Sequence, residues 1–364
     1  MENLASIFNI VDEVGEIRPL KIGHINDSYI VGSKYEDGNW YFLQKINHNI
    51  FRDVAGLQNN ISLVTNHIRT KLKAAGVSDI ERKVLRLIPT YTGELYHQDS
   101  FGDYWRLYKL IRGTSSYDVL TAELAYKAGK AFGNFQDMLS DIPHDQLIES
   151  IPNFHNMEFR LEQFREAVRN NIAGRLSETQ KLVEEIENRA EEMCQPERLF
   201  REGLLPKRVN HCDTKVNNLL FDVNDEPVCI VDLDTVMPGY VLSDFGDFMR
   251  TGANTGAEDD PDLNDVSFNM EIFKSYTRGY LESAKSFLTA TEIELLPFGA
   301  KLMTYMQLTR FLTDYLNGDT YYKINNPLHN LQRSRAQFKL LQSIELNYSD
   351  MQKFINQIIS GQPD

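Results

Sequence analysis

Residues 211–218 read His-Cys-Asp-Thr-Lys-Val-Asn-Asn, and residues 229–234 read Cys-Ile-Val-Asp-Leu-Asp. The first stretch sets Asp213 and Asn218 at the two ends of one tight polar loop. An apolar, strand-forming run then leads to Asp232, which follows Asp213 by 19 residues. This separation allows the chain to turn back and to present Asp232 opposite Asn218.

The residue types in this segment suit phosphoryl transfer. The transition state of that reaction is loose, so catalysis consists mainly of positioning and charge neutralisation. One carboxylate must orient the acceptor hydroxyl, oxygen ligands must hold Mg²⁺, and a cation must face the transferred group. The four side chains that could supply these functions are those of Asp213, Lys215, Asn218 and Asp232.

The first hundred residues read as strand-rich with one long helix. Two β-favouring runs, 29–31 and 40–46, flank Asp37-Gly38, which is a strong hairpin signal. Further strands are expected over 83–88 and 104–111. A helix is predicted between the hairpin and these later strands, and it ends near Gly76. The apolar residues along one side of this helix are Val54, Leu57, Ile61, Val64, Ile68 and Leu72. This order predicts an antiparallel sheet with a helix on one side.

The chain changes character after the short polar stretch 112–116. From about residue 121 it is mostly helical, with long patterns over 158–195, 265–288 and 291–317. We therefore expect an α+β protein in three parts. They are a strand-rich lobe over 1–110, a hinge over 111–118, and a helical lobe over 119–364 that holds the polar loop.

Composition and charge exclude several classes of partner. The formal net charge of −14 argues against nucleic-acid binding, which requires a basic face. No apolar run approaches membrane-spanning length, so no membrane association is expected. The N-terminus lacks the features of a signal peptide, and three unpaired-looking cysteines (Cys194, Cys212 and Cys229) favour a reducing cytoplasm.

The pattern His-x-Asp-x-Lys-x-x-Asn over 211–218 resembles the catalytic loop of protein kinases. With the later apolar-apolar-Asp, the chain resembles the aminoglycoside phosphotransferase and choline kinase branch, and most closely the N-acetylhexosamine 1-kinases. Further matching stretches are Gly-His-Ile-Asn (23–26), Phe-Leu-Gln (42–44), Trp-Arg-Leu-Tyr-Lys (105–109), Ala-Phe-Gly-Asn-Phe-Gln (131–136), Asp-Leu-Asp-Thr-Val-Met-Pro-Gly (232–239), Asp-Phe-Gly-Asp (244–247) and Arg-Phe-Leu-Thr-Asp-Tyr-Leu (310–316).

This resemblance implies a protein-kinase-like two-lobe fold that binds ATP and Mg²⁺ in the cleft between the lobes. It makes 1–110 the nucleotide-binding lobe and 119–364 the lobe with the catalytic loop and the sugar site. It gives the base position to Asp213, the phosphate-facing position to Lys215, and the Mg²⁺ positions to Asn218 and Asp232. The implied acceptor is the anomeric hydroxyl of N-acetylglucosamine or N-acetylgalactosamine. The substrate positions that the resemblance implies are His24 and Asn26, in the loop expected to cover the site, and Arg310 and Tyr321.

A residue of the strand over 40–46 is expected to contact ATP from the sheet. The expected strand lysine falls within Leu43-Gln44-Lys45, and strand alternation places Gln44 and Lys45 on opposite faces. The registers of related kinases favour Gln44 at this position, which departs from the kinase pattern. Residues 108–111, namely Tyr108, Leu110 and Ile111 with Lys109 between them, are expected to hold adenine by backbone hydrogen bonds.

Three nearby residues have competing interpretations. His211 is expected to brace the loop by hydrogen-bonding a backbone carbonyl. Asp234 is either a second metal ligand or a capping residue. Asp244, in Asp244-Phe245-Gly246, imitates the metal-binding Asp-Phe-Gly of protein kinases, but it falls beyond the strand that ends in Asp232. We expect it to be a helix N-cap with a structural role.

Two rival functions use the same residues. The scaffold also phosphorylates choline, homoserine or aminoglycosides, and clustered carboxylates in the acceptor wall would indicate such cationic substrates. A catalytically inactive nucleotide-binding module is the other alternative, although Asp213, Lys215, Asn218 and Asp232 are all present. The sequence sets neither the preferred hexosamine nor the oligomeric state.

Overall fold

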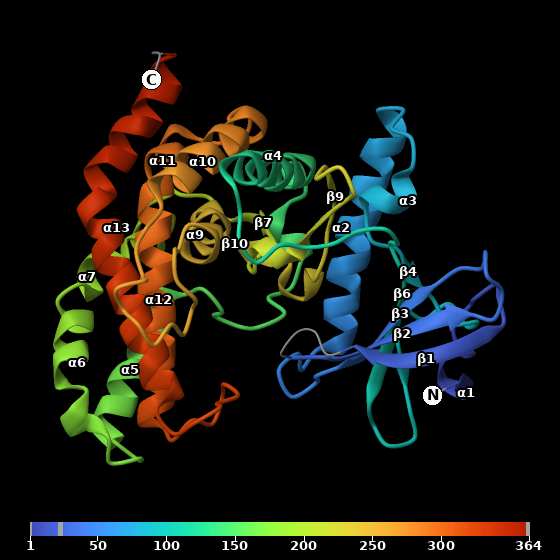
Figure 1. Cartoon of the computed structure of the whole chain (residues 1–364), viewed down its shortest axis with the longest axis horizontal. Helices are drawn as coiled ribbons and strands as arrows, with labels where there is room; N and C mark the ends of the chain where they lie inside the picture. Colours follow the sequence, from blue (N-terminus) through green and yellow to red (C-terminus); the bar gives the residue numbers. More distant parts are fainter. Residues whose placement is uncertain (1, 21–24, 362–364) are drawn as a thin grey trace. The chain divides into compact units, whose positions relative to one another are not determined.

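The computed structural model describes residues 2–20 and 25–361 of the chain. They form two compact units. Unit 1 comprises Met1–Ser116, Asp145–Pro152 and Leu219–Met237, and unit 2 comprises Tyr117–His144, Asn153–Asn218 and Pro238–Asp364. Unit 1 holds a small antiparallel sheet and unit 2 is mainly helical (Figure 1), so the α+β fold class is confirmed.

The sheet of unit 1 has the strand order β1-β2-β3-β6-β4, with β5 pairing to β6. All these pairs are antiparallel. The strands are β1 (Val14–Leu20), β2 (Asp27–Ser33), β3 (Tyr41–Ile46), β4 (Leu87–Ile88), β5 (His97–Gln98) and β6 (Tyr104–Lys109). The predicted hairpin is confirmed as β2 and β3. The strand expected over 83–88 is shortened because the short helix α3 (Ile80–Lys83) occupies its start.

The two faces of this sheet differ in polarity. Leu43 and Leu107, which are register partners, lie in an apolar cluster with Val31 and with Phe8, a residue that follows the short helix α1 (Glu2–Ala5). Successive side chains of a strand point to opposite faces. Gln44 therefore lies on the other face, as its register partner Arg106 does. That second face carries the polar residues of interest.

The helix α2 (Val54–Ala74) belongs to the same unit and begins as the sequence predicts. The Asp53 side chain accepts a hydrogen bond from the Gly56 amide, which caps the helix. The buried Asn60 amide donates to the carbonyls of Ile148 and Val236. These bonds tie α2 to the segments 145–152 and 219–237, both of which the sequence-based division places with the helical part.

A small hairpin lies in the segment 219–237. Its strands β8 (Leu219–Phe221) and β9 (Pro227–Ile230) are antiparallel, and Leu219 pairs with Ile230. A 3-10 turn, η4 (Leu233–Thr235), follows directly. The hairpin therefore returns the chain to the level of its own start, as the spacing of the polar segment predicts.

Unit 2 is built from helices around a short two-stranded sheet of β7 (Arg208–Asn210) and β10 (Met237–Gly239). The 3-10 helices are η1 (His144–Gln146), η2 (Leu176–Glu178) and η3 (Val216–Asn218). The α-helices are α4 (Ala122–Leu139), α5 (Met157–Asn170), α6 (Gln180–Glu187), α7 (Ala190–Met193), α8 (Gln195–Arg201), α9 (Val241–Gly252), α10 (Met270–Ala284), α11 (Ala290–Glu294), α12 (Leu296–Leu316) and α13 (His329–Ser360).

The helical pattern predicted over 158–195 is broken in the structure. Asn171 has a left-handed backbone (φ 39°), and its amide bonds to the Ala167 carbonyl, which ends α5. Its side chain then accepts from the Leu176 amide. A left-handed residue at a helix C-terminus is a common stop, and Asn tolerates this conformation better than most residues. The apolar period continues past this stop, which explains the longer prediction.

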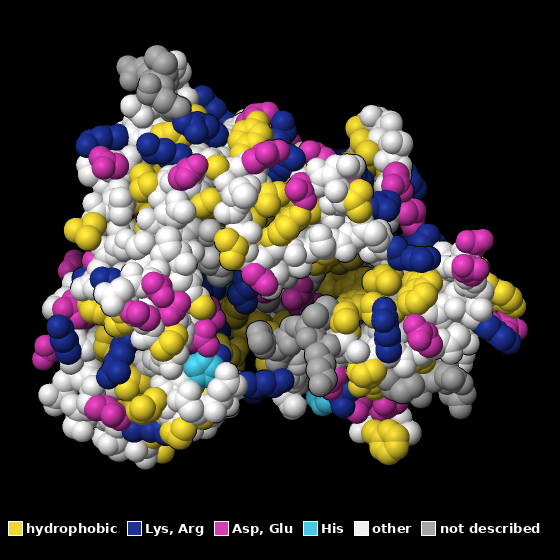
Figure 2. All heavy atoms as spheres, in the orientation of Figure 1, with side chains coloured by type: hydrophobic (Ala, Val, Ile, Leu, Met, Phe, Trp, Pro, Cys, Tyr) yellow, Lys and Arg dark blue, Asp and Glu magenta, His cyan; other side chains and the backbone are white. Residues whose placement is uncertain are grey.

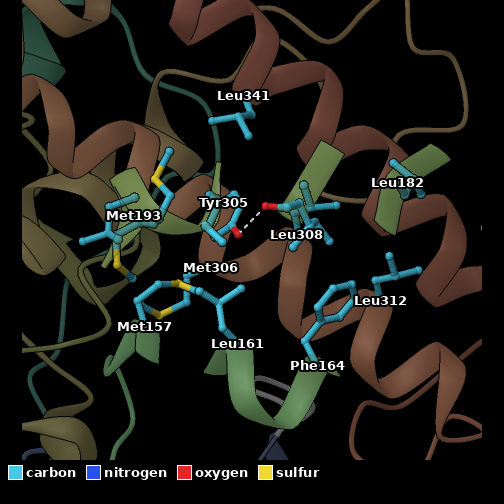
Figure 3. Packing of buried hydrophobic residues seen from close by; sticks show 14 of the residues in the cluster. Met157, Leu161, Phe164, Leu182, Met193, Tyr305, Met306, Leu308, Leu312 and Leu341 are labelled. Carbon is cyan, nitrogen blue, oxygen red and sulfur yellow. Dashed lines mark hydrogen bonds between the residues drawn. The ribbon is translucent and has the colours of Figure 1, made fainter. Parts of the chain in front are cut away.

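The core of unit 2 lies around α12, which packs against α5, α9 and α13. Figure 3 shows this cluster, in which Met157, Leu161 and Phe164 of α5 meet residues of α12. Tyr305 is fully buried, and its hydroxyl donates to the Ile186 carbonyl at 2.8 Å. A buried tyrosine hydroxyl requires such a partner, so α12 is apolar on nearly all sides without leaving this group unsatisfied.

Charged side chains of both signs are interspersed on the face shown in Figure 2. No single-sign basic field is visible there, in keeping with the net charge of −14. Among the described residues, none of the helices combines the length and apolar composition that a membrane-spanning helix needs.

Candidate active site

The predicted catalytic loop leaves β7 at Asn210 and ends in η3. Cys212, directly before Asp213, has a left-handed backbone with φ 62°. Among the described non-glycine residues it is the one left-handed residue that is neither Asn nor Asp. Such a conformation is costly for other side chains and persists where the surroundings enforce it, which is typical of functional sites.

The carboxylate of Asp213 is held from both sides within unit 2. Lys215 Nζ lies 3.0 Å from Asp213 Oδ1. The Asn218 amide nitrogen donates to Asp213 Oδ2 at 3.1 Å and to the Asp213 carbonyl at 2.8 Å. The Asp213 side chain is a quarter exposed (25%), so it is oriented by these partners and still accessible. The structure thus brings together three of the four predicted catalytic and metal-binding residues.

The charge of Asp213 is stabilised by these neighbours. Burial alone raises the pKa of Asp213. The Lys215 ammonium, with smaller contributions from His211 and Arg250, outweighs burial and brings the pKa below its ordinary value. The same ion pair raises the pKa of Lys215. Asp213 is therefore ionised at neutral pH, as a residue that accepts a hydroxyl proton must be, although it is a weak base.

Asp244 braces this loop from α9. Its carboxylate accepts the amides of His211 at 2.9 Å and Cys212 at 2.7 Å, and its backbone carbonyl accepts the Thr214 hydroxyl. The predicted N-cap role is wrong, because the N-cap of α9 is Tyr240 and Asp244 lies inside the first turn. Asp244 does have a structural role, as expected, but the role is to hold the left-handed backbone before Asp213.

His211 also braces the loop. Its Nδ1 accepts the backbone amide of Asp213 at 3.2 Å. The ring is fully buried, with Phe132 and Phe135 edge-on to it. Its place in the loop is thus set by aromatic packing as well as by hydrogen bonding.

A second charged cluster lies behind Lys215. Arg250 donates two hydrogen bonds to Asp247 Oδ1, at 2.9 and 3.0 Å, and another to Glu258. Both carboxylates raise the pKa of Lys215 further, after its first partner Asp213. Arg250 is only 4% exposed, so this cluster is a fixed element of the site rather than a mobile surface pair.

Asp232 belongs to unit 1 and has a left-handed backbone with φ 59°. It follows β9 and opens the η4 turn, two residues before Asp234. The open question over Asp234 is answered by its contacts. Its carboxylate forms a buried ion pair with Arg106 at 2.5 Å and accepts the Asn26 amide at 2.6 Å. It is therefore a buried structural carboxylate.

The residues predicted to hold the nucleotide lie on or beside the sheet. Gln44 accepts two hydrogen bonds from Arg106. Lys45, on the opposite face, pairs with Asp103 at 2.8 Å. Tyr108 is buried. The Leu110 amide bonds to the Trp40 carbonyl, and the Ile111 carbonyl accepts the Thr114 hydroxyl. The Leu110 amide is thus already used inside unit 1.

The predicted covering loop is described only in part. His24 lies outside the described residues. The side-chain amide of Asn26 forms hydrogen bonds through both of its polar atoms. Its nitrogen donates to Asp234, and its oxygen accepts the Asn47 backbone amide at 2.9 Å. In this structure Asn26 therefore acts as a brace within unit 1.

Arg310 and Tyr321 are neighbours in unit 2. The Arg310 guanidinium lies 5.9 Å from the Tyr321 ring centre and 5.1 Å from that of Phe154. Sequence reasoning missed the residue that holds this arrangement. Asp314 is buried and accepts the backbone amides of Thr320, Tyr321 and Tyr322 at 2.8–3.0 Å. A lone carboxylate in the apolar stretch 310–316 was the available signal.

The sequence comparison agrees with this geometry. The model of the phosphotransferase enzyme family (APH) matches residues 16–278, which include the catalytic loop, the hairpin and the sheet. The chain belongs to this family. This phosphotransferase has two of its predicted substrate positions, Arg310 and Tyr321, beyond the matched range.

Solved structures with the same fold are distant in sequence from this phosphotransferase. Spectinomycin phosphotransferase in complex with ADP and spectinomycin has a TM-score of 0.56 at 14% identity, covering 93% of this chain and 95% of its own. Plasmodium vivax ethanolamine kinase has a TM-score of 0.57 at 14% identity (92% and 84%). Amicoumacin kinase with AMP-PNP and Ca²⁺ has a TM-score of 0.59 at 11% identity (92% and 91%). Identities this low establish the fold alone, which is that of the kinase-like phosphotransferases.

The predicted magnesium ligands are one amide and one carboxylate rather than a cluster of carboxylates. Among the described residues, no group of three His, Cys, Asp or Glu side chains could hold a metal ion by itself. A nucleotide-bound Mg²⁺ does not need such a group, since phosphates and water complete its shell around one or two protein oxygens. Because the Asn218 amide nitrogen is committed to Asp213, its Oδ1 points away from that residue, which suits an oxygen ligand.

Proposed function

We propose that this phosphotransferase transfers the terminal phosphoryl group of ATP, with Mg²⁺, to the anomeric hydroxyl of an N-acetylhexosamine. The observation that carries the proposal is a pair of arginines, Arg160 and Arg310, that have no carboxylate partner among the described residues. Both contact Phe154, whose ring stacks on that of the partly buried His155. Membership of the family establishes phosphotransfer as the class of reaction. The arrangement of the arginines supports a neutral acceptor over a cationic one.

Asp213 acts on the acceptor hydroxyl. The partners Lys215 and Asn218 fix the plane of its carboxylate, so that it orients the hydroxyl and takes its proton late in the reaction. An anomeric hydroxyl is more acidic than an ordinary alcohol, which matches the weak basicity of Asp213. Lys215, 39% exposed, is the cation that faces the transferred group.

Asn218 and Asp232 are the oxygen donors for Mg²⁺ in this proposal. Asn218 directly precedes Leu219, and Leu219 pairs with Ile230, two residues before Asp232. The two donors thus flank the hairpin in the sequence, one directly before its first strand and one shortly after its second. When held by these residues, Mg²⁺ would supply neutralisation of the phosphate charge.

The arginine pair is Arg160 and Arg310. Arg160 donates to the Phe154 carbonyl at 2.9 and 3.1 Å, and Arg310 donates to Gln307. Burial and the charge of Arg310 lower the pKa of Arg160 to about 10, so it remains a cation at neutral pH. In the part of the chain that the structure describes, neither guanidinium pairs with a carboxylate.

The positive charges of Arg310 and Arg160 act on His155. Burial, Arg310 and Arg160 lower its pKa well below the ordinary value, so the ring is neutral. Its buried Nδ1 has no hydrogen-bond partner among the described residues. Buried ring nitrogens are rarely left unpaired, and a hydroxyl of the acceptor is a suitable partner.

This environment favours a neutral acceptor that is rich in hydroxyl and carbonyl oxygens. An ammonium group would meet two uncompensated positive charges, which disfavours choline, ethanolamine or aminoglycoside acceptors. Guanidinium groups donate well to carbonyl oxygens, such as that of an N-acetyl group. The side chains of Tyr321 and Tyr322 add aromatic surface beside Arg310.

A panel assay of ADP release tests the proposal. With Mg·ATP, we expect N-acetylglucosamine or N-acetylgalactosamine to give kcat/KM at least 100-fold above that of choline, ethanolamine, homoserine or an aminoglycoside. The product should lose its phosphate in mild acid, as anomeric phosphates do. Turnover with an amine alone would contradict the acceptor assignment, and the absence of a single turnover with every acceptor would indicate an inactive nucleotide-binding module.

A further inference from the structure

Arg106 is the largest fully buried side chain of the sheet, and the mechanism above gives it no task. We propose that Arg106 is a positioning residue that fixes the metal-binding turn, residues 232–236, through Asp234 and Gln44. This inference rests on the proposed function in assigning a metal-binding role to Asp232. Arg106 also supplies a buried positive charge in the sheet, where a lysine is expected and Gln44 is found.

Arg106 joins two parts of unit 1 that are far apart in the sequence. Its Nε and Nη2 donate to Gln44 Oε1 at 3.1 and 2.7 Å, across the β3–β6 register. Its Nη1 lies 2.5 Å from Asp234 Oδ1. The two side chains of this ion pair are 1% and 5% exposed, so water does not compete for either charge.

Neutral polar groups complete the arrangement. Gln44 donates to the Ser28 hydroxyl at 3.2 Å. Asn26 donates to Asp234 Oδ2 at 2.6 Å, while its own oxygen accepts the Asn47 amide. Both oxygens of Asp234 therefore have a partner, Oδ1 in Arg106 of β6 and Oδ2 in Asn26, the residue before β2. These two contacts fix the orientation of the Asp234 carboxylate.

The turn that follows Asp232 is held along its length. The Asp234 carbonyl accepts the Ser150 hydroxyl at 2.8 Å, and the Val236 carbonyl accepts the Asn60 amide at 3.0 Å. Asp232, with its left-handed backbone, stands at the start of the turn. Holding Asp234 therefore limits the directions in which the Asp232 carboxylate points.

Arg106 is also the charge that allows two carboxylates to share this turn. Burial lowers its pKa, but Asp234 and then Tyr108 and Asp232 outweigh that effect, so it stays protonated. Removing one partner of a buried pair leaves an uncompensated charge and is strongly destabilising, whereas replacing both by neutral groups is often tolerated. A comparison of the single and double variants therefore separates an effect on metal-dependent nucleotide binding from an effect on stability.

The test compares Arg106→Met, Arg106→Lys and the double variant Arg106→Met/Asp234→Asn. The readouts are the melting temperature and the affinity for a fluorescent ATP analogue, with Mg²⁺ and with EDTA. We expect Arg106→Met to lower both the melting temperature and the Mg²⁺-dependent affinity. The double variant should regain the melting temperature but keep an affinity in Mg²⁺ at least 10-fold below that of the unaltered chain. Arg106→Lys should recover part of the affinity.

Arg189→Met is the matched control, because it breaks an arginine pair with Glu345 in unit 2 that no proposed site uses. It should lower the melting temperature without changing Mg²⁺ dependence. Affinity in the double variant equal to that of the unaltered chain would overturn the positioning role. Because binding needs no acceptor, a protein that binds Mg²⁺·nucleotide but phosphorylates no sugar would refute the proposed function and leave this inference testable by the same variants.

Discussion

Asp213, Asp232 and Asp244 are identical side chains in three different environments. Asp213 is partly exposed between a lysine and an amide. Asp244 is buried, and its pKa is raised mainly by that burial although His211 and two backbone amides oppose the effect. Asp232 opens a left-handed turn. These surroundings assign a different task to each residue, and substitutions can separate them.

The first prediction concerns the base. Asp213→Asn keeps an oxygen for the Asn218 amide but removes the proton acceptor, so kcat should fall by about 10²–10⁴. Nucleotide affinity and melting temperature should stay nearly unchanged, because the side chain is isosteric and a quarter exposed (25%). Steady-state kinetics and nucleotide titration measure the two effects. Activity equal to that of the unaltered chain would remove the base assignment.

The second prediction separates the metal ligand from the loop brace. Asp232→Ala should weaken nucleotide binding in Mg²⁺ and leave binding in EDTA unchanged. Asp244→Ala should instead lower the melting temperature, since the amides of His211 and Cys212 lose their acceptor, at about 1–3 kcal/mol for each buried group. If only Asp244→Ala abolished Mg²⁺ dependence, the metal ligand would have been misassigned.

At the scale of elements, α9 carries the loop brace because it crosses α12 very closely. A Cβ atom added to Gly246 would lie 2.0 Å from the Gly299 carbonyl oxygen and 2.8 Å from Met303. Such contacts force the helices apart. The Asp244-Phe245-Gly246 sequence is thus explained by packing, with the glycine required for the approach of the two helices.

The third prediction follows from this crossing. Gly246→Ala should destabilise the fold by about 1–3 kcal/mol or more, because overpacking a close crossing displaces backbone. Thermal unfolding measures the loss. Gln352→Ala, at an exposed position of α13, is the control and should be nearly neutral. An unchanged melting temperature in Gly246→Ala would mean that α9 and α12 are less closely packed.

The fourth prediction concerns the loop after α12. Asp314 binds three successive backbone amides and the Asn330 side chain, which orders the loop that carries Tyr321. Asp314→Ala should raise KM for the acceptor about 10-fold or more, at roughly 1–3 kcal/mol of lost hydrogen bonding, with a smaller effect on KM for ATP. Asp314→Asn keeps one acceptor oxygen and should be milder. Equal effects on both substrates would contradict a local role.

At the scale of the whole molecule, one buried carboxyl makes stability depend on pH. Glu197 is 6% exposed, and its Oε1 accepts the Met157 amide at 2.9 Å, while its Oε2 has no hydrogen-bond partner among residues 2–20 and 25–361. Burial raises its pKa to about 7, above the ordinary 4.5. Its proton is thus held more tightly in the folded state, and its contribution is fully present below pH 4.5. That contribution is lost as pH rises through about 7.

The fifth prediction tests this linkage. Glu197→Gln keeps the oxygen that accepts the Met157 amide and removes the ionisation. Above pH 7 the variant should be more stable than the unaltered chain, by up to about 3 kcal/mol. Between pH 4.5 and 7 its stability should fall less as the pH rises. Urea unfolding at several pH values measures the difference, and parallel curves would show that Glu197 ionises normally.

The sequence by itself determined the fold class, the hairpin, and the polar loop that brings Asp213, Lys215 and Asn218 together. These features depend on local rules: strand alternation, turn residues and a short motif whose members lie within eight positions. The family resemblance added Arg310 and Tyr321, which the structure places side by side. Local chemistry was sufficient because neighbours in the chain are neighbours in space.

Only the tertiary structure decided the tasks of Arg106, Asp234, Asp244 and Asp314. Each of them acts through a partner on another element, such as Asp234 on Arg106 across 128 positions of the chain. A buried charge needs a specific counter-charge or amide, and periodicity says nothing about which distant residue supplies it. The physical reason is that apolar burial follows from pattern, whereas the pairing of buried polar groups follows from the register of the folded chain.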